Sequence, residues 1–308
     1  MFDIIIGNPP YNKGGIKSSS GKHLGEKNET IWPLFVNKAF EMLKEDGYLL
    51  YIHPLSFLRK SHSVYNIILE KHLIYLELWD NIQSKQLINA EIPLAIYLLK
   101  NTTKKEETEI CTILKELRVE KTSRAFLKIG ESIPFAYHNI FNKLADFIKK
   151  NNLQLEYNSR LIKIDGEKFK LPKEYTINDL LYIDTYKIKE GIIVKKGLFQ
   201  HPDADKRKLI IANKCKFKGI FIDENKLGLT GSNKYYILGD NLELIQKILS
   251  FKVFNIVCDY TKYNQNFLNP AAFGFIPDLR KLNIKDITED EFYDLIGFTE
   301  EEKSFLLK

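Results

Sequence analysis

The sequence predicts an α/β fold in residues 1–125, followed by a mixed α+β domain in residues 126–308. In the first part, unbroken apolar runs at 4–6 and 48–52 are typical of strands buried on both faces, and a helical segment separates them. In the second part, short β-like runs recur between Gly, Asn and Asp residues, which is typical of a small mixed domain.

The composition predicts a soluble cytoplasmic protein. Of the 308 residues, 44% are hydrophobic and 28% are charged, which is ordinary for a globular protein. The sequence has no run of about 18 apolar residues, so no membrane span is expected. Asp3 interrupts the start of the chain, so no signal peptide is expected either. The three cysteines are scattered singly and predict neither a metal site nor a disulfide framework: they are Cys111, Cys215 and Cys258. We expect them to be small buried hydrophobic residues.

The first strand and the turn after it are the main candidate site. Ile4 to Ile6 predict a central strand buried on both faces, which Gly7 and the double proline end abruptly. Proline has no backbone donor, so the carbonyls of Asn8 and Pro9 are expected to point outward as acceptors. Tyr11 places an aromatic ring beside them. Such a turn can stack on a planar base and accept hydrogen bonds from its exocyclic amino group.

The next elements are a polar loop and a helix. Residues 12–29 are rich in glycine and serine and predict a surface loop, which could either close over DNA through lysines such as Lys13 or simply be solvated. Thr30 is the expected N-cap of a helix through Glu45, with Pro33 in its first turn. Gly47 is the expected residue after the helix end.

Three further strands complete the first part. Residues 48–52 predict a buried strand ended by His53 and Pro54, and residues 56–71 predict a helix. Strands are expected at 74–79 and 92–99, separated by a loop at 81–91. No crossover helix fits between these two strands, so they should be antiparallel.

Asn8-Pro9-Pro10-Tyr11, after a hydrophobic strand with an Asp near its start, resembles the catalytic motif of S-adenosylmethionine-dependent amino-group methyltransferases. It is most similar to the adenine-specific (N6) DNA methyltransferases of restriction-modification systems, Asn-Pro-Pro-Tyr class. The resemblance implies that Asn8 and the Pro9 carbonyl accept hydrogen bonds from the adenine amino group. It also implies that Tyr11 stacks on the flipped base and that Pro10 stiffens the turn.

The same resemblance implies the fold and the cofactor. Residues 1–125 would be the carboxy-terminal half of a Rossmann-like methyltransferase sheet, including its reversed final strand. The cofactor would be S-adenosylmethionine, with Asp3 and Asn8 as the candidate contacts in this chain. The family often offers a second aromatic residue from the loop before the last strand, and residues 81–91 contain none.

In the second part, residues 104–121 predict a solvated connector with a strand at 110–114. An amphipathic helix is expected at 139–150 and another near 241–250. Four short strands are expected between them, and aromatic-rich loops follow. These strands are at 192–194, 209–212, 220–222 and 235–238.

Basic residues gather in this second part. Residues 186–226 contain eleven Lys or Arg and five Asp or Glu, an excess of six, while the whole chain has a net charge of +6. Three clusters predict phosphate contacts: Lys195 and Lys196; Lys206, Arg207 and Lys208; and Lys214, Lys216 and Lys218. A basic domain after the catalytic half resembles the target-recognition arrangement of these methyltransferases, so the expected partner is double-stranded DNA.

The glycine-rich cofactor turn of the family is not found in the sequence. Gly228 to Lys234 has the wrong glycine spacing, and Phe273-Gly274-Phe275 lacks the second glycine. We therefore expect the chain to be the carboxy-terminal part of a larger enzyme, or a subunit completed by a partner. Alone, it should bind S-adenosylmethionine poorly and be inactive.

Two other functions stay open at this stage. Similar turns occur in methyltransferases that act on RNA or on glutamine in release factors, which usually lack a large basic domain after the catalytic half. The chain could also be a non-catalytic DNA-recognition fragment of a truncated methyltransferase. The intact Asn8 and Tyr11 favour the enzyme.

Overall fold

The computed structural model describes the chain except residues 14–28, 90–91, 105, 115–117, 125–131, 160, 188–190, 213–216, 218–219, 225, 232–233, 264–267 and 308. The chain divides into two compact units. Unit 1 comprises Met1–His138 with Tyr263–Gln265, and unit 2 comprises Asn139–Lys262 with Asn266–Lys308. The division after His138 lies thirteen residues beyond the predicted domain limit at 125.

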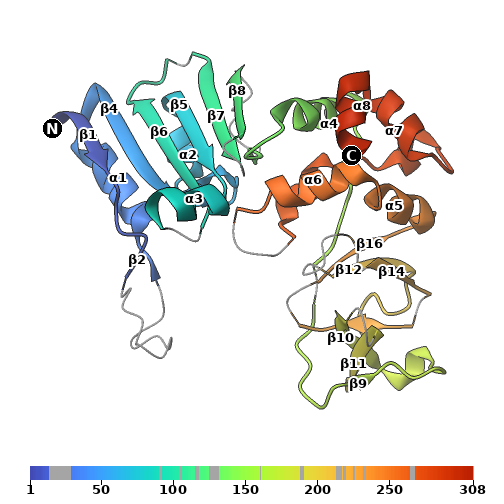
Figure 1. Ribbon diagram of the computed structural model, residues 1–308. Helices are drawn as coiled ribbons and strands as arrows, with labels where there is room; N and C mark the ends of the chain where they lie inside the picture. The colour runs from blue at the N-terminus through green and yellow to red at the C-terminus, as the bar shows by residue number, and fades with distance from the viewer. Residues whose placement is uncertain are drawn as a thin grey trace. The chain divides into compact units, whose positions relative to one another are not determined.

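Unit 1 is built on a mixed sheet, which confirms the predicted α/β class. Its described strands follow the order β1-β4-β6-β5-β7-β8, which can be traced across the sheet in Figure 1. β1, β4, β5 and β7 run in one direction, whereas β6 and β8 run in the other. The strands are β1 Phe2–Gly7, β4 Leu43–Pro54, β5 His72–Trp79, β6 Leu94–Lys100, β7 Thr108–Leu114 and β8 Arg118–Arg124.

The reversed strand lies inside the sheet. β6 is antiparallel to β5, with Trp79 opposite Leu94, as the short connection predicted. β6 is also antiparallel to β4, so it lies between β4 and β5. β7 and β8 extend the sheet as a hairpin, whereas only the first of them was predicted within a solvated connector.

β1 is an edge strand among the described residues, and the prediction that it is buried on both faces is wrong. It pairs in parallel with β4, with Gly7 opposite Tyr51. Ile4 is 60% exposed and Ile6 is 72% exposed, and Phe2 on the same face is also exposed. Ile4 to Ile6 have the sequence of a buried strand, but no residue of the described part of the chain covers that face. Unpaired strand edges of this kind readily accept another strand.

The helices of unit 1 are shorter than predicted. α1, Trp32–Met42, begins after Ile31 rather than Thr30, and Gly47 lies inside β4 rather than at a helix end. The predicted helix at 56–71 is a 3₁₀ helix η1, Leu55–Leu58, and a short α2, Tyr65–Leu69. The polar residues between them form turns, because the His62 and Tyr65 amides donate to carbonyls three residues back.

The predicted loop at 81–91 is largely a helix, α3 Asn81–Ile88. The Asp80 carboxylate accepts hydrogen bonds from the Ile82 and Gln83 amides, at 2.9 Å each. This N-cap satisfies two helix donors directly after β5 ends. A short ladder, β2 Asn12–Lys13 with β3 Glu29–Thr30, frames residues 14–28, so most of the predicted glycine-rich loop lies outside the described residues.

Unit 2 has the predicted α+β character, and each of its predicted short strands is confirmed. Its described strands form two small sheets, β15-β10-β11-β9 and β14-β12-β16. Leu181, Ile183, Val194, Leu229 and Tyr236 are buried together in the core of these sheets. The strands are β9 Phe169–Lys170, β10 Leu181–Lys187, β11 Gly191–Lys196, β12 Lys208–Ala212, β14 Ile220–Asp223, β15 Gly228–Leu229 and β16 Lys234–Leu238.

The helices predicted in unit 2 are confirmed, but several others were missed. The chain after residue 250, predicted as loops, is mostly helical. α7 begins with a capping box, in which Thr288 and Glu291 satisfy each other's backbone amides. The helical elements are α4 His138–Asn151, η3 Ile177–Asp179, α5 Leu242–Leu249, α6 Lys252–Tyr260, η4 Pro270–Phe275, η5 Leu279–Leu282, α7 Glu289–Ile296 and α8 Glu300–Leu307.

Cys111 and Cys258 are buried, as predicted, and Cys215 lies outside the described residues. No helix in the described part of the chain is long and apolar enough to cross a membrane. The same part contains no group of three or more His, Cys, Asp or Glu side chains arranged to hold a metal ion.

Candidate active site

The Asn8-Pro9-Pro10-Tyr11 turn follows β1 directly, at the carboxyl end of the strand. Asn8 and Pro10 are exposed, whereas Pro9 is buried and Tyr11 is half-buried. β1 and β4 are parallel, so the turn and the end of β4 at His53 lie at the same edge of the sheet. In α/β sheets ligands bind at this carboxyl edge. The turn therefore presents an exposed amide side chain where a ligand is expected.

Gly7 has to be small because a buried ring lies against it. A Cβ atom on Gly7 would be 2.9 Å from Cε1 of Tyr51, the residue opposite it on β4. Tyr51 is buried, and its burial raises the pKa of its phenol. The glycine thus lets β4 support the base of the turn closely.

Tyr11 is fixed through its backbone and partly enclosed. Its carbonyl accepts a hydrogen bond from the Ile31 amide at 3.0 Å, so the chain returns to the turn just before α1. Its hydroxyl oxygen is buried and has no hydrogen-bond partner among the residues that the structure describes. This burial raises the pKa of Tyr11 to about 12. Tyr11 therefore stays neutral at physiological pH and can act as a ring, not as a base.

The ring of Trp32, the residue after Ile31, contacts two imidazoles. Its ring stacks on His53 at a centroid distance of 4.0 Å and on His62 at 4.9 Å. The His53 Nε2 atom lies 3.2 Å from the Tyr97 hydroxyl, and its Nδ1 atom lies 3.0 Å from the Pro54 carbonyl. Burial lowers the pKa of His53 to about 3 and that of His62 to about 4, so both are neutral.

The stacked rings of Trp32, His53 and His62, called here the ring column, were not predicted from the sequence. The signal that could have found it is a histidine directly after a buried strand, at the edge where ligands bind. In the structure the column anchors the start of α1, and through Ile31 it holds the backbone of Tyr11.

Asp3 and Asn8, the two candidate cofactor contacts, are not brought together. Asp3 is exposed near the start of β1 and pairs with Lys44, whose Nζ atom is 2.8 Å from Oδ1. This ion pair lowers the pKa of Asp3. The five residues from Asp3 to Asn8 span about 16 Å along an extended strand. Asp3 therefore ties the two strands together at the end opposite the turn.

The residues described here do not form a cradle for S-adenosylmethionine. A glycine-rich turn would have to join a parallel strand to a helix. In the described part of the chain, β1 leads into the proline turn, β4 into η1 and β5 into α3 through Asp80. None of these three connections in the described part of the chain is a glycine-rich turn that joins a strand to a helix.

The predicted phosphate contacts have different surroundings. Lys13 and Lys196 are exposed, on β2 and at the end of β11. Lys195 is partly buried, and its Nζ atom donates to the Ile164 carbonyl at 2.9 Å and lies 3.6 Å from Asp184. Three further predicted contacts lie outside the described residues, namely Lys214, Lys216 and Lys218.

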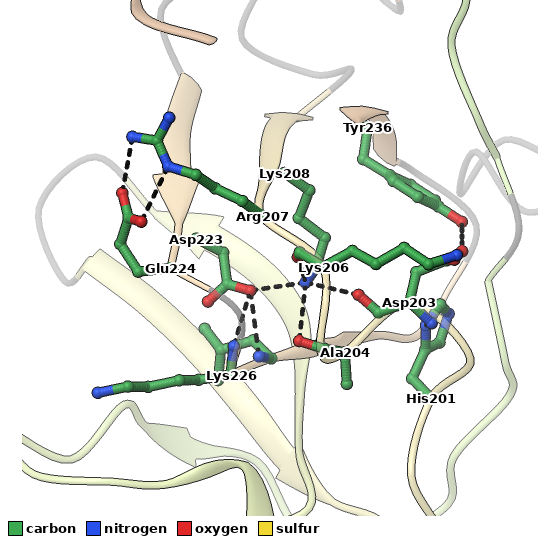
Figure 2. A network of polar contacts seen from close by, with 11 residues as sticks. His201, Asp203, Ala204, Lys206, Arg207, Lys208, Asp223, Glu224, Lys226 and Tyr236 are labelled. Carbon is green, nitrogen blue, oxygen red and sulfur yellow. Dashed lines mark hydrogen bonds and ion pairs between the residues drawn. The ribbon is translucent and has the colours of Figure 1, made fainter. Parts of the chain in front are cut away.

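Figure 2 shows the cluster of Lys206, Arg207 and Lys208, in which each basic side chain contacts a carboxylate. Lys206 Nζ lies 2.6 Å from Asp203 Oδ1, and Arg207 forms a two-pronged pair with Glu224 and contacts Glu243. Lys208 is fully buried, 2.7 Å from Asp223. A buried ammonium cannot reach a phosphate. The prediction that Lys208 contacts phosphate is therefore wrong for this conformation, and Lys208 is a structural residue.

Comparison with known proteins shows what the first part of the chain is similar to. Residues 1–87 match the family model described as Eco57I restriction-modification methylase. The match contains the Asn8–Tyr11 turn, β1, α1 and β4. This part of the chain is therefore similar to restriction-modification methylases.

A protein of Methanocaldococcus jannaschii named as a type II restriction enzyme and methyltransferase, RM.MjaORFECS2P, is 40% identical over 60 residues. That match covers 18% of this chain and 5% of the relative. Among solved structures, the type IIL restriction-modification enzyme MmeI in complex with DNA matches with a TM-score of 0.47 and 10% identity. The match covers 89% of this chain and 46% of that one.

The type IIG restriction endonuclease BpuSI matches with a TM-score of 0.33 and 11% identity, covering 96% of this chain and 48% of that one. The chain thus spans about half the length of these two solved structures.

Proposed function

We propose that this chain is the substrate-binding part of a restriction-modification DNA methyltransferase that methylates the N6 amino group of a flipped adenine. The observation that carries the proposal is the exposed Asn8 side chain at the carboxyl edge of the β1–β4 pair, inside the segment that matches the methylase family. Asn8 Oδ1 and the Pro9 carbonyl accept hydrogen bonds from the adenine amino group, and the neutral Tyr11 ring stacks on the base.

These groups act by position rather than by proton transfer. Two acceptors on the amino hydrogens orient the nitrogen and make its lone pair more available, while the two prolines keep the acceptors from turning away. S-adenosylmethionine supplies the methyl group when it is bound. The described residues do not cradle it, so this chain holds and orients the amino group.

The exposed face of β1 supports a missing cofactor part. Phe2, Ile4 and Ile6 present apolar side chains to solvent, and the outer edge of β1 has no strand partner among the described residues. We propose that a polypeptide carrying the glycine-rich cofactor turn pairs with this edge and covers this face, as a preceding segment or as a separate subunit.

The experiment is a methyl-transfer assay with tritiated S-adenosylmethionine and duplex DNA, in the presence of a supplied amino-terminal methyltransferase half. We expect Asn8→Ala to abolish transfer while DNA affinity stays within about twofold, because the side chain is exposed and contacts the base alone. Asn12→Ala, another exposed Asn four residues later, is the matched control and should keep full activity. Equal loss of transfer and of DNA binding in Asn8→Ala would contradict the assigned role.

Two controls separate the other functions. Duplexes without adenine should accept no methyl group, and neither should a release factor or RNA. Isothermal titration of the chain alone should show weak or no binding of S-adenosylmethionine. Tight, stoichiometric binding would refute the missing cofactor part but not the role of Asn8.

A further inference from the structure

Unit 2 carries an exposed apolar tip on the connection between β11 and β12, residues 197–207. Leu198 is 94% exposed and Phe199 is 53% exposed, and Gly197 separates them from Lys196. Single exposed apolar residues are common on protein surfaces. Leu198 and Phe199 differ from such single residues, because they are adjacent and stand on a loop whose backbone is fixed. On a mobile loop, the two side chains would fold against the protein.

The backbone under this tip is held by Tyr182. A Cβ atom on Gly197 would be 2.5 Å from the Tyr182 ring, and one on Gly228 would be 2.8 Å from it, so both glycines pack directly on this ring. The Tyr182 hydroxyl donates to the Phe199 carbonyl at 2.8 Å. The Gly197 amide donates to the Leu180 carbonyl, also at 2.8 Å. The side chains of the tip are thus exposed on a backbone that is fixed.

The other half of the connection is fixed by the buried network in Figure 2. The Tyr236 hydroxyl donates to Asp203 Oδ2 at 2.6 Å, and the Asp203 amide donates to His201 Nδ1 at 3.1 Å. Lys208 Nζ donates to the carbonyls of Asp203 and Lys206, at 2.8 Å each. These buried hydrogen bonds hold the backbone of the surface loop in one conformation.

Positive charge lies close to the tip in the chain. Lys196 is exposed two residues before Leu198. At the far end of the connection, Lys206 is 53% exposed but pairs with Asp203, and Asp205 beside it is exposed. Lys170, on the neighbouring strand β9 opposite Ile193, is exposed as well. An exposed apolar pair that follows a strand bearing the exposed Lys196 and flanked by the exposed Lys170 fits a partner with a charged backbone and an apolar interior, which describes duplex DNA.

From this combination we infer that Leu198 and Phe199 form a wedge that inserts between base pairs of duplex DNA. The inference rests on the proposed function, because it takes DNA as the partner. Side chains of these types unstack a base step and fill the space that opens. The rigid support keeps the wedge ready, so little ordering is needed when DNA binds. Lys170 and Lys196 hold the phosphates beside the opened step.

The test compares two fluorescent duplexes of about 30 base pairs and equal sequence, one intact and one with a central abasic site. An abasic site removes the cost of opening the stack, so the full chain should bind the abasic duplex about fivefold or more tightly. The double variant Leu198→Ser with Phe199→Ser should lose this preference and keep its affinity for the intact duplex. Leu295→Ser, an exposed leucine on α7, is the matched control and should keep the preference.

The outcomes are distinct. An equal preference in wild type and double variant, with DNA still bound, overturns the wedge alone. No binding of either duplex by the wild type refutes DNA as the partner, and the wedge with it. Binding to phosphatidylglycerol vesicles that is lost in the double variant, with the duplex preference unchanged, would assign the tip to a membrane surface and also overturn the wedge.

Discussion

Replacing Lys208 with methionine removes the positive half of a buried ion pair. Lys208 Nζ lies 2.7 Å from Asp223 Oδ2, and neither side chain has appreciable exposure. Burial lowers the pKa of Lys208, and the nearby Asp223 charge partly offsets that effect. Methionine has a similar length and fills the same space, so the change tests charge and hydrogen bonding rather than packing.

The cost follows from the contacts that are lost. At 2.7 Å and an effective dielectric constant of about 20, the attraction between the two charges is about 6 kcal/mol, part of which offsets their desolvation. Lys208 also donates to three backbone carbonyls, which would lose their buried donor. Asp223 keeps the Lys226 and Leu227 amides at 3.2 Å, which limits the loss. We expect Lys208→Met to lower the free energy of unfolding of unit 2 by about 3–5 kcal/mol.

The two tryptophans make the measurement selective. Trp32 and Trp79 both belong to unit 1, so tryptophan fluorescence reports that unit, while the loss of helical circular dichroism reports both. In urea, the variant should shift a circular-dichroism transition and leave the fluorescence midpoint unchanged. On heating, a loss of this size in a unit of this length corresponds to a melting temperature lower by roughly 6–20 °C.

Two variants sharpen the test. Lys206→Met removes an ammonium that is 53% exposed, and should cost less than about 1 kcal/mol. Adding Asp223→Asn to Lys208→Met removes the unpaired carboxylate and should recover part of the lost stability. A Lys208→Met protein within about 1 kcal/mol of wild type would refute the argument that this pair holds the loop.

Three further predictions concern both units. His53 binds a proton at a pKa of about 6.5 when unfolded and about 3 when folded, so the unfolded state holds more protons between these values. The contribution of His53 to the stability of unit 1 is therefore complete above pH 6.5 and falls by about 1.4 kcal/mol per pH unit as the pH decreases below 6.5. Urea titrations at pH 7 and 5 should show this loss of unfolding free energy. His53→Gln should reduce the dependence of the unfolding free energy on pH. Gly7→Ala places a Cβ 2.9 Å from the Tyr51 ring, so it should cost about 1–3 kcal/mol by fluorescence-monitored unfolding, and less when combined with Tyr51→Leu. Gly197→Ala places a Cβ 2.5 Å from the Tyr182 ring, so it should displace the ring from the Phe199 carbonyl and weaken the abasic-duplex preference; an unchanged preference would show that the tip does not need its support.

Strands were predicted more successfully than helices. The strands at 74–79, 92–99 and 110–114, and the four short ones of unit 2, are all present, because runs of β-branched and aromatic residues fit the pleated, partly buried surface of a sheet. The helix at 139–150 was found because its apolar residues repeat at helical spacing. The helices after residue 250 were missed. Each of the α-helices among them has only eight or nine residues, a length at which capping and tertiary packing rather than propensity hold a helix.

The candidate site also has one part that could be predicted from the sequence and one part that could not. Asn8 to Tyr11 could be identified from the sequence because a proline-stiffened turn is a local feature, and its position at the end of β1 is confirmed. Trp32, His53 and His62 are far apart in the sequence, and only the packing of α1 against the end of β4 stacks their rings.

By itself, the sequence determined the strands, the turn between Gly7 and Tyr11 and the α/β order of unit 1, because each depends on residues that are neighbours in the chain. Only the tertiary structure decided that Ile4 and Ile6 are exposed, that Asp3 pairs with Lys44 far from Asn8, and that Lys208 is buried beside Asp223. The physical reason is that burial and charge pairing depend on which distant residues surround a side chain. A lysine beside other basic residues has the same local sequence whether it faces solvent or a buried carboxylate.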